Sequence, residues 1–163
     1  MGECIYTWRM KTAPRDVDRR LCATVAETCT ASELRKAARA VSNLFDAEMR
    51  RTGIRTSQFS LLVALELAGE ATVTRLAEAL ALDRTTMTRN LGPLERQGLV
   101  ASVAGDDRRN RLLRLTEKGR RTLARALPVW ERVQAGVVRR LGETRWKGLL
   151  QGLKAAVSMA RSA

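Results

Sequence analysis

The stretch that decides the fold is VTRLAEALALDRTTMTRNLGPLERQGLV, residues 73–100. A first helix is predicted from apolar residues at positions i, i+3, i+4 and i+7 of one face, which are Val73, Leu76, Ala77 and Leu80. In a second helix, Met87, Leu91 and Leu94 fall on one narrow face. The connection between them is limited to residues 81–83, which predicts a helix-turn-helix.

A hairpin is predicted directly after these two helices. The segments LVASVA (99–104) and RLLRL (111–115) have the apolar content of strands, and GDDRRN (105–110) is the loop between them. Thr116 can cap the next helix, where Glu117 suits the positive end of the helix dipole. Two helices followed by a hairpin indicate a winged helix-turn-helix, a mainly α fold of the α+β kind with a two-stranded wing.

Helical patterns flank this region on both sides. With Ser32 as a cap, apolar residues recur at helical spacing toward a predicted end near Gly53. Thr56 and Ser57 are candidate caps of the following helix, which Gly69 ends. Two apolar stripes predict the last helices: Leu123, Leu127, Trp130, Val133, Val137 and Leu141, and then Trp146, Leu149, Leu150, Leu153 and Val157.

These patterns predict the domain organisation. Residues 1–31 form an irregular or partly helical arm, and residues 32–163 form a single domain with the winged helix at 56–115. The helices at 32–53 and 117–162 carry more apolar surface than a small winged domain can cover. We therefore expect them to form the interface of a homodimer. The alternative is that they thicken the core of a monomer.

The composition favours a nucleic-acid partner. The 163 residues carry 30 Lys and Arg against 17 Asp and Glu, a net charge of +13, and arginine supplies almost all of the positive charge. The chain has no histidine, which argues against most hydrolase chemistry. Without an apolar run long enough to span a membrane or a signal pattern, a cytoplasmic protein that does not insert into membranes is expected.

The outward face of the second helix is the candidate reading surface for DNA. Arginine can form a bidentate hydrogen bond with guanine O6 and N7, and threonine can contact a thymine methyl group or a base edge. The candidate residues are Arg84, Thr85, Thr86, Thr88, Arg89, Pro93 and Arg96. Gly92 and Pro93 predict a kink or an early end near Arg89. The alternative is an ordinary solvated helix face.

The charged loop 105–110 is the second candidate DNA contact. An arginine at the end of a hairpin can enter the narrow minor groove. Asp106 and Asp107 would repel phosphate, so we expect a carboxylate to pair with a neighbouring guanidinium and restrict its rotamers. The alternative is a polar hairpin turn without a role in binding.

The quoted stretch, together with DDRRNRLLRLTEKGR (106–120), resembles the MarR family of bacterial winged-helix transcription regulators. The resemblance covers roughly residues 32–155. It implies a homodimer on a palindromic double-stranded DNA operator, with the recognition helix at 83–98 and the wing at 99–115.

The resemblance also implies the roles of individual wing residues. Arg109 is the groove-entering residue and Asp107 its acidic partner, while Arg108 and Arg111 contact the adjacent DNA backbone. The doubled DDRR leaves open which of Arg108 and Arg109 enters the minor groove.

Two kinds of effector remain as alternatives. The cysteines Cys4, Cys22 and Cys29 suit oxidation, an intersubunit disulfide or a thiophilic metal ion. On one shared helix, Cys22 and Cys29 would lie about 10.5 Å apart along the axis, too far for a bond within one chain. The alternative is that both are small buried residues whose thiols have no role. The rival effector is a small aromatic acid.

The predicted function is that of a repressor released from its operator by a small molecule, by cysteine oxidation or by a soft metal. The alternative is a constitutive architectural DNA-binding protein without an effector. An enzyme is not expected, because the sequence has no GxGxxG, P-loop or Ser-x-x-Lys pattern. No cofactor is required by either interpretation.

Overall fold

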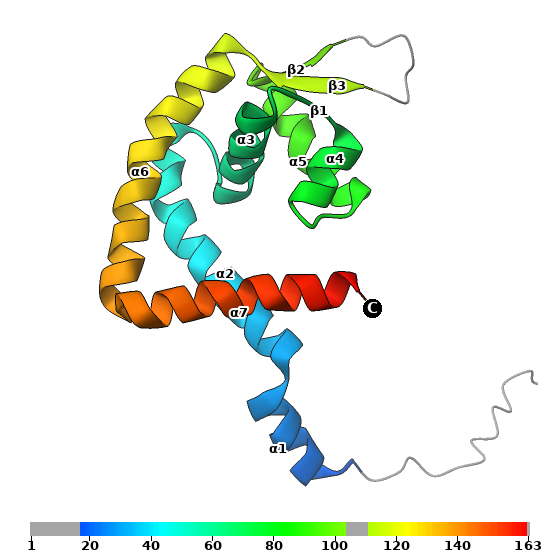
Figure 1. Cartoon of the computed structure of the whole chain (residues 1–163), viewed down its shortest axis with the longest axis vertical. Coiled ribbons are helices and arrows are strands. Elements are labelled where there is room, and N and C mark those ends of the chain that lie inside the picture. The colour runs from blue at the N-terminus through cyan, green and yellow to red at the C-terminus, as the bar shows by residue number, and fades with distance from the viewer. Residues whose placement is uncertain (1–16, 104–110, 163) are drawn as a thin grey trace, which may run out of the picture. The chain divides into compact units, whose positions relative to one another are not determined.

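The computed structural model describes residues 17–103 and 111–162 and is mostly helical (Figure 1). The elements are α1 (Arg19–Thr28), α2 (Thr30–Met49), the 3-10 helix η1 (Arg50–Thr52), α3 (Thr56–Ala68), β1 (Glu70–Thr72), α4 (Val73–Ala79), α5 (Arg84–Arg96), β2 (Val100–Val103), β3 (Leu112–Leu115), α6 (Glu117–Leu141) and α7 (Glu143–Arg161). The predicted fold class is confirmed: the structure is a winged helix with helical segments before and after it.

The chain divides into two compact units, residues 1–40 and 41–163, and α2 crosses the division. In the first unit, α1 is capped by Asp18, whose Oδ1 accepts hydrogen bonds from the backbone N–H of Arg20 at 2.9 Å and of Leu21 at 3.2 Å. No residue of α1 is buried. Within the described part of the predicted arm, residues 17–31, the chain forms α1 and the first two residues of α2.

Ser32 is not the cap of α2, contrary to the prediction. The backbone N–H groups of Ser32 and Glu33 both donate to the carbonyl oxygen of Cys29, at 2.9 and 3.0 Å. Because this carbonyl accepts the first bonds, the helix begins at Thr30 and Ser32 lies inside it.

The core of the second unit is built around α3. Leu61, Leu62 and Leu65 on α3 are fully buried and pack in one cluster with apolar residues from the neighbouring helices and strands. Among these neighbours, Met87 and Leu94 on α5 are also fully buried. The winged helix is thus held together by one continuous apolar core.

The strands form a three-stranded antiparallel sheet in the order β1-β3-β2. Ala71 of β1 pairs with Leu113 of β3, and Val100 of β2 pairs with Leu115. The predicted hairpin is confirmed, whereas β1 was not predicted because a strand of three residues leaves no periodic pattern. Thr72 ends β1 and also caps α4, accepting from the N–H of Arg75 at 3.2 Å.

The start of α3 differs from the prediction. Thr56 and Ser57 lie inside the helix, and the cap position is Arg55, which has extended backbone. The Oε1 atom of Gln58 accepts from the N–H of Arg55 at 2.8 Å, and Oδ1 of Asp46 accepts from the N–H of Thr56 at 2.7 Å. Two side chains from other positions therefore satisfy the donors that a hydroxyl cap would have satisfied.

Asp46 remains charged in this role. Partial burial alone would raise its pKa, but hydrogen bonding to Thr56 and the positive charges of Arg55 and Arg50 hold the pKa below its ordinary value.

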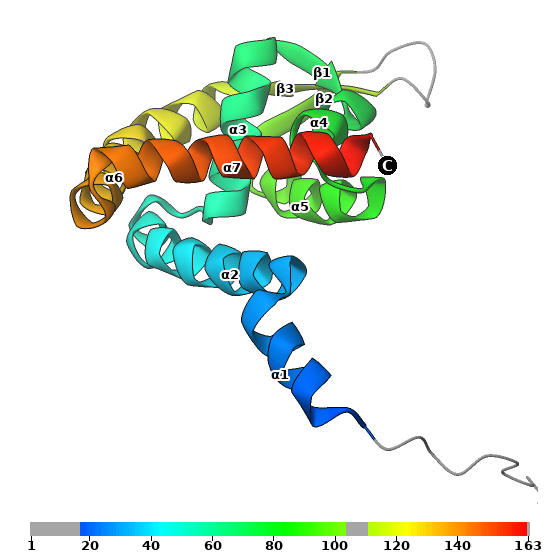
Figure 2. The ribbon, with the colours of Figure 1, turned by 60° about the horizontal axis from the view of Figure 1, so that its bottom comes forward.

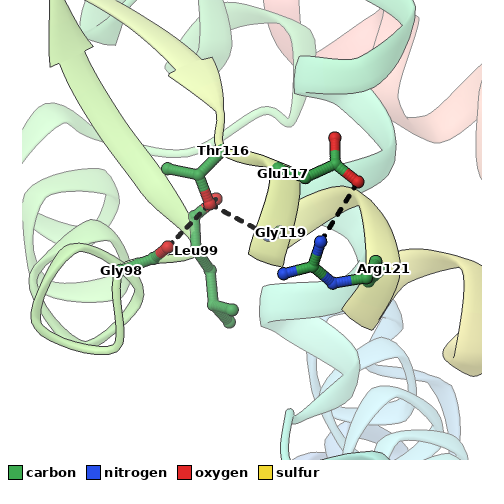
Figure 3. A network of polar contacts seen from close by, with 6 residues as sticks. All are labelled: Gly98, Leu99, Thr116, Glu117, Gly119 and Arg121. Atoms are coloured by element: carbon green, nitrogen blue, oxygen red, sulfur yellow. Dashed lines mark hydrogen bonds and ion pairs between the residues drawn. The ribbon is translucent and has the colours of Figure 1, made fainter.

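The hairpin is joined to α6 by the network in Figure 3. Thr116 caps α6 as predicted, because its Oγ1 accepts from the N–H of Gly119 at 3.0 Å. The same hydroxyl donates to the carbonyl oxygen of Gly98 at 2.6 Å, and the N–H of Thr116 donates to the carbonyl of Leu99 at 3.0 Å. A Cβ atom on Gly119 would lie 2.1 Å from the carbonyl oxygen of Leu99, so only glycine fits at this contact.

The last two helices meet at Gly142, which has a φ of 78°, and Figure 2 shows the sharp corner between them. Trp130 on α6 stacks on Phe59 of α3, with ring centroids 6.5 Å apart. No residue of α7 is buried. At its end, Nη2 of Arg161 donates to the carbonyl oxygen of Glu78, the last but one residue of α4, at 2.5 Å.

Candidate nucleic-acid interface

The orientation of α5 is fixed at its start and along its inner face. Asp83 caps the helix: its Oδ1 accepts from the N–H of Thr86 at 2.8 Å, and its Oδ2 accepts from the hydroxyl of Thr86 at 2.6 Å. These hydrogen bonds lower the pKa of Asp83. Met87, Leu91 and Leu94 are buried, as their spacing predicted. The remaining faces of α5 are thereby turned toward solvent.

The exposed side of α5 carries positive charge and hydroxyl groups. Its exposed candidate residues are Arg84, Thr85, Thr88, Arg89 and Arg96. All of these except Arg96 line one hollow on the surface of the helix. Guanidinium groups beside short hydroxylated side chains can bind both phosphates and base edges.

The threonines of this helix differ in what they can still bind. The hydroxyl of Thr86 is occupied by Asp83, and Thr86 is half-buried. The hydroxyl of Thr88 donates to the carbonyl oxygen of Arg84 at 2.9 Å, so its lone pairs and methyl group remain for an external partner. Thr85 and Thr88 are therefore better placed for base contacts than Thr86.

The prediction near Pro93 was a kink or an early end of the helix, and the early end is wrong. α5 continues to Arg96, and the N–H of Gln97 donates to the carbonyl oxygen of Pro93 at 3.0 Å. Leu91 and Leu94 are buried on either side of the proline, and this packing holds the helix where one backbone donor is missing. Pro93 itself is half-buried and lies at the edge of the exposed face.

Arg111 lies at the base of the hairpin and contacts α5. Its Nη2 is 2.6 Å from Oε1 of Glu95, and its Nε donates to the hydroxyl of Ser102 on β2. The side chain thus joins the hairpin to the candidate recognition helix, and its predicted contact with the DNA backbone stays a prediction. Glu95 and Ser102 were not predicted, because the contacts join positions that no local pattern connects.

The other predicted wing residues, Asp107, Arg108 and Arg109, lie outside the described residues, as does Cys4. Cys22 is exposed on α1, and Cys29 is half-buried. Cys29 has extended backbone and ends α1, so the two cysteines do not share one helix. The alternative that both cysteines are small buried residues is wrong for Cys22, which is exposed, and Cys29 is only half-buried in the single chain. Within 17–103 and 111–162, no three Cys, Asp or Glu residues are grouped to hold a metal ion.

Two short helices, an exposed basic face on the second and a following hairpin define the class of winged helix-turn-helix proteins, whose second helix enters the major groove of DNA. In the described part of the chain, no helix is both long and apolar enough to cross a membrane.

The comparison with known proteins agrees with this class. A family model described as "MarR family" matches residues 52–109. The M. tuberculosis transcriptional regulator MosR, solved in complex with DNA, is 36% identical, with a TM-score of 0.72 over 82% of this chain and 99% of that chain. The transcriptional repressor CouR, bound to a 23-mer DNA duplex, is 29% identical, with a TM-score of 0.72 over 82% of this chain and 94% of that chain.

A curated relative from Bacillus subtilis (strain 168), the uncharacterized HTH-type transcriptional regulator YwoH, is 28% identical over 86 residues. That match spans 53% of this chain and 63% of the relative, which is less than two thirds of its length. Together with the similarity to MosR over nearly its whole length, these findings show that the chain belongs to the MarR family of DNA-binding transcriptional regulators, which are not enzymes.

Proposed function

We propose that the chain is a homodimeric transcriptional repressor that binds a palindromic double-stranded DNA operator. The observation that carries the proposal is the exposed face of α5, where Arg84 and Arg89 flank Thr85 and Thr88 in one hollow. The similarity to MosR in complex with DNA and to the repressor CouR on a DNA duplex supports the same conclusion. A two-fold axis would present one α5 helix to each half-site.

Exposed apolar side chains support the homodimer. The second unit carries partly or largely exposed apolar residues on α2, α6 and α7: Val41, Leu44, Leu127, Trp130, Leu141, Leu149, Leu150, Leu153, Val157 and Met159. Monomeric proteins rarely expose so many large apolar side chains on adjoining helices. A second copy of the chain would remove them from water.

A pocket in the second unit supports release of the DNA by a small-molecule effector. This pocket lies between α2 and α6 and has apolar walls from Leu44, Val133 and Val137. Its charged lining consists of three arginines, Arg132, Arg139 and Arg140, and one acid, Glu48, so it is basic on balance. This combination suits a small aromatic acid, whose ring contacts the walls and whose carboxylate pairs with a guanidinium.

The alternative effector acts on sulfur. The thiol of Cys22 is exposed and that of Cys29 is half-buried, so oxidants and thiophilic metal ions can reach at least the first. No cofactor is needed for DNA binding in either case.

The experiment that tests the function begins with a duplex recovered by the full chain from a random-sequence pool. Footprinting on this duplex is expected to show a short inverted repeat with half-sites about one helical turn apart, or a multiple of that distance. A reporter gene placed behind the duplex should lose expression when the chain is produced. Protection of mixed sequences with little discrimination would favour the architectural alternative, to which the net charge of +13 also gives support.

The same complex is then treated with benzoate, hydrogen peroxide or Zn²⁺. Release by peroxide or zinc that is lost in the Cys22→Ser, Cys29→Ser variant would assign the response to the thiols. Release by benzoate that survives these substitutions would assign it to the pocket. A complex that none of these agents dissociates would contradict the effector proposals for these probes.

A further inference from the structure

A second basic pocket lies beside α5, between this helix and the segment that joins α2 to α3. Arg50 on η1, Arg55 before α3 and Arg89 on α5 all line it. Ser57 and Gln97 add an exposed hydroxyl and an exposed amide. No carboxylate is among the lining residues, so the pocket presents hydrogen-bond donors and positive charge without a competing anion.

The guanidinium groups of this pocket are available to a ligand. Within the described part of the chain, no carboxylate oxygen lies within 4.0 Å of Arg50, Arg55 or Arg89. The nearby Asp46 feels the charges of Arg50 and Arg55, but its Oδ1 is held by the N–H of Thr56 at 2.7 Å. The three arginines are all exposed.

The backbone that carries the arginines is held in place. The N–H of Arg55 donates to Oε1 of Gln58, which is buried beneath the pocket. η1 ends at Gly53, whose φ of 83° turns the chain toward buried Ile54. The side chains are therefore presented from a fixed frame, which lowers the entropy lost when a ligand is bound.

Arg89 connects this pocket to the hollow on the exposed face of α5, because it lines both. A continuous basic strip thus runs from Arg84 through Arg89 to Arg50 and Arg55. When a helix lies in the major groove, which is about 12 Å wide, the phosphate backbones run along both of its sides. A basic strip that leaves the helix sideways meets one of these backbones.

We propose that Arg50 and Arg55 bind phosphates of the DNA backbone that borders the groove read by α5. The contacts position the helix and carry no base information. This inference rests on the proposed function, since it requires that α5 docks on duplex DNA. The occupant is a phosphodiester of the duplex and not a small anion free in solution.

The test compares three single variants of the full chain, Arg50→Ala, Arg55→Ala and Arg51→Ala. Arg51 is the matched control, because it is exposed on the same 3-10 helix but does not line the pocket. Binding is measured by fluorescence anisotropy, at several salt concentrations, on the recovered duplex and on an unrelated duplex of equal length. Thermal unfolding of each variant is compared with the parent. Only a small shift is expected, because these side chains are exposed and the charge interaction of Arg50 and Arg55 with Asp46 is screened by solvent.

In the Arg50→Ala and Arg55→Ala variants, the slope of log K against log salt should become shallower by about 0.9 for each phosphate that the variant no longer neutralises. Both duplexes should be weakened by the same factor, and Arg51→Ala should leave the slope unchanged. Equal effects of Arg50→Ala and Arg51→Ala would overturn the inference, since they would reflect only the general charge. A loss of affinity confined to the recovered duplex would indicate base contacts and would overturn it as well.

A further measurement with inorganic phosphate tests whether the pocket binds a small free anion instead of the DNA backbone. If millimolar phosphate at constant ionic strength releases DNA from the parent but not from Arg50→Ala, the pocket holds a free anion and the inference is wrong. A parent that binds no duplex contradicts the proposed function, and the inference with it. A parent that binds DNA while both pocket variants behave like the control contradicts the inference alone.

Discussion

Gly119 occupies a position where any side chain collides with the backbone. The atom that blocks it is the carbonyl oxygen of Leu99, 2.1 Å from the place of a Cβ atom. Gly119→Ala must therefore move α6 away from the turn after α5, or distort the cap at Thr116. We expect the free energy of unfolding to fall by about 1–3 kcal/mol, as for other overpacked sites. Urea unfolding at a fixed protein concentration measures the change.

Gly136→Ala is the control for this substitution. Gly136 lies on the same helix, and a Cβ atom there has no neighbour within 4 Å. Alanine should stabilise the helix at this position by up to about 1 kcal/mol. If Gly119→Ala behaves like Gly136→Ala, the close approach to Leu99 does not constrain the protein.

At the level of single residues, the sequence predicted what depends on local chemistry. Thr116 was identified as a cap because it directly precedes its helix. The cap of α3 was missed, because its donors are satisfied by Gln58 inside the helix and by Asp46 ten residues before Thr56. Contacts between distant positions leave no local pattern.

At the level of the element, the stability of α5 depends on the charge of its cap. Hydrogen bonds from Thr86 lower the pKa of Asp83 in the folded protein. A carboxyl group with a lowered folded pKa stabilises the fold above its unfolded pKa, and this contribution is lost as the pH falls through the folded value. The parent should thus be more stable than Asp83→Asn at neutral pH, and the difference should vanish in acid, below the ordinary range of aspartate.

Asparagine is a suitable replacement because it also caps helices but does not titrate. Thermal unfolding of both proteins across the acidic range isolates Asp83, since every other group, including Asp46, titrates in both. A stability difference that does not depend on pH would show that the charge of Asp83 has no part in the cap.

The elements of the winged helix were largely predictable from apolar spacing, and the errors have physical causes. The spacing of Met87, Leu91 and Leu94 predicted the buried face of α5. Of the two outcomes predicted from the Gly-Pro pair, a kink or an early end, the early end is wrong. Tertiary packing overrides the missing donor there. The charged groups of the candidate interface were predicted on α5, whereas Arg50 and Arg55 were not, because only the fold brings their segment beside Arg89.

At the level of the whole molecule, the exposed apolar residues of α7 make the homodimer testable. Leu149 and Leu153 lie one turn apart and are 48% and 38% exposed. Replacing both by glutamate would bury two charges in the proposed interface, a large cost without partners. The double variant should be a monomer by sedimentation equilibrium at concentrations where the parent is a dimer.

Leu67→Glu is the matched control, since Leu67 is 84% exposed but lies on α3, outside the terminal helices. This variant should remain a dimer. A double variant that stays dimeric would show that the interface lies elsewhere. A parent that sediments as a monomer would contradict the homodimer itself. The sequence predicted apolar stripes on these helices, but burial by a partner is a property of the assembly that one chain does not encode locally.

The junction between the hairpin and α6 is made almost entirely with main-chain acceptors. The carbonyl oxygens of Gln97, Gly98 and Leu99 accept hydrogen bonds from Lys118 and Thr116. Such a junction responds to the number of residues between its parts more than to their side-chain chemistry. One residue inserted after Leu115 would shift every donor by one position, whereas residues added beyond the paired ends of β2 and β3 would leave all of them in register. The protein can therefore change the reach of its hairpin while the frame behind it keeps a fixed chain length.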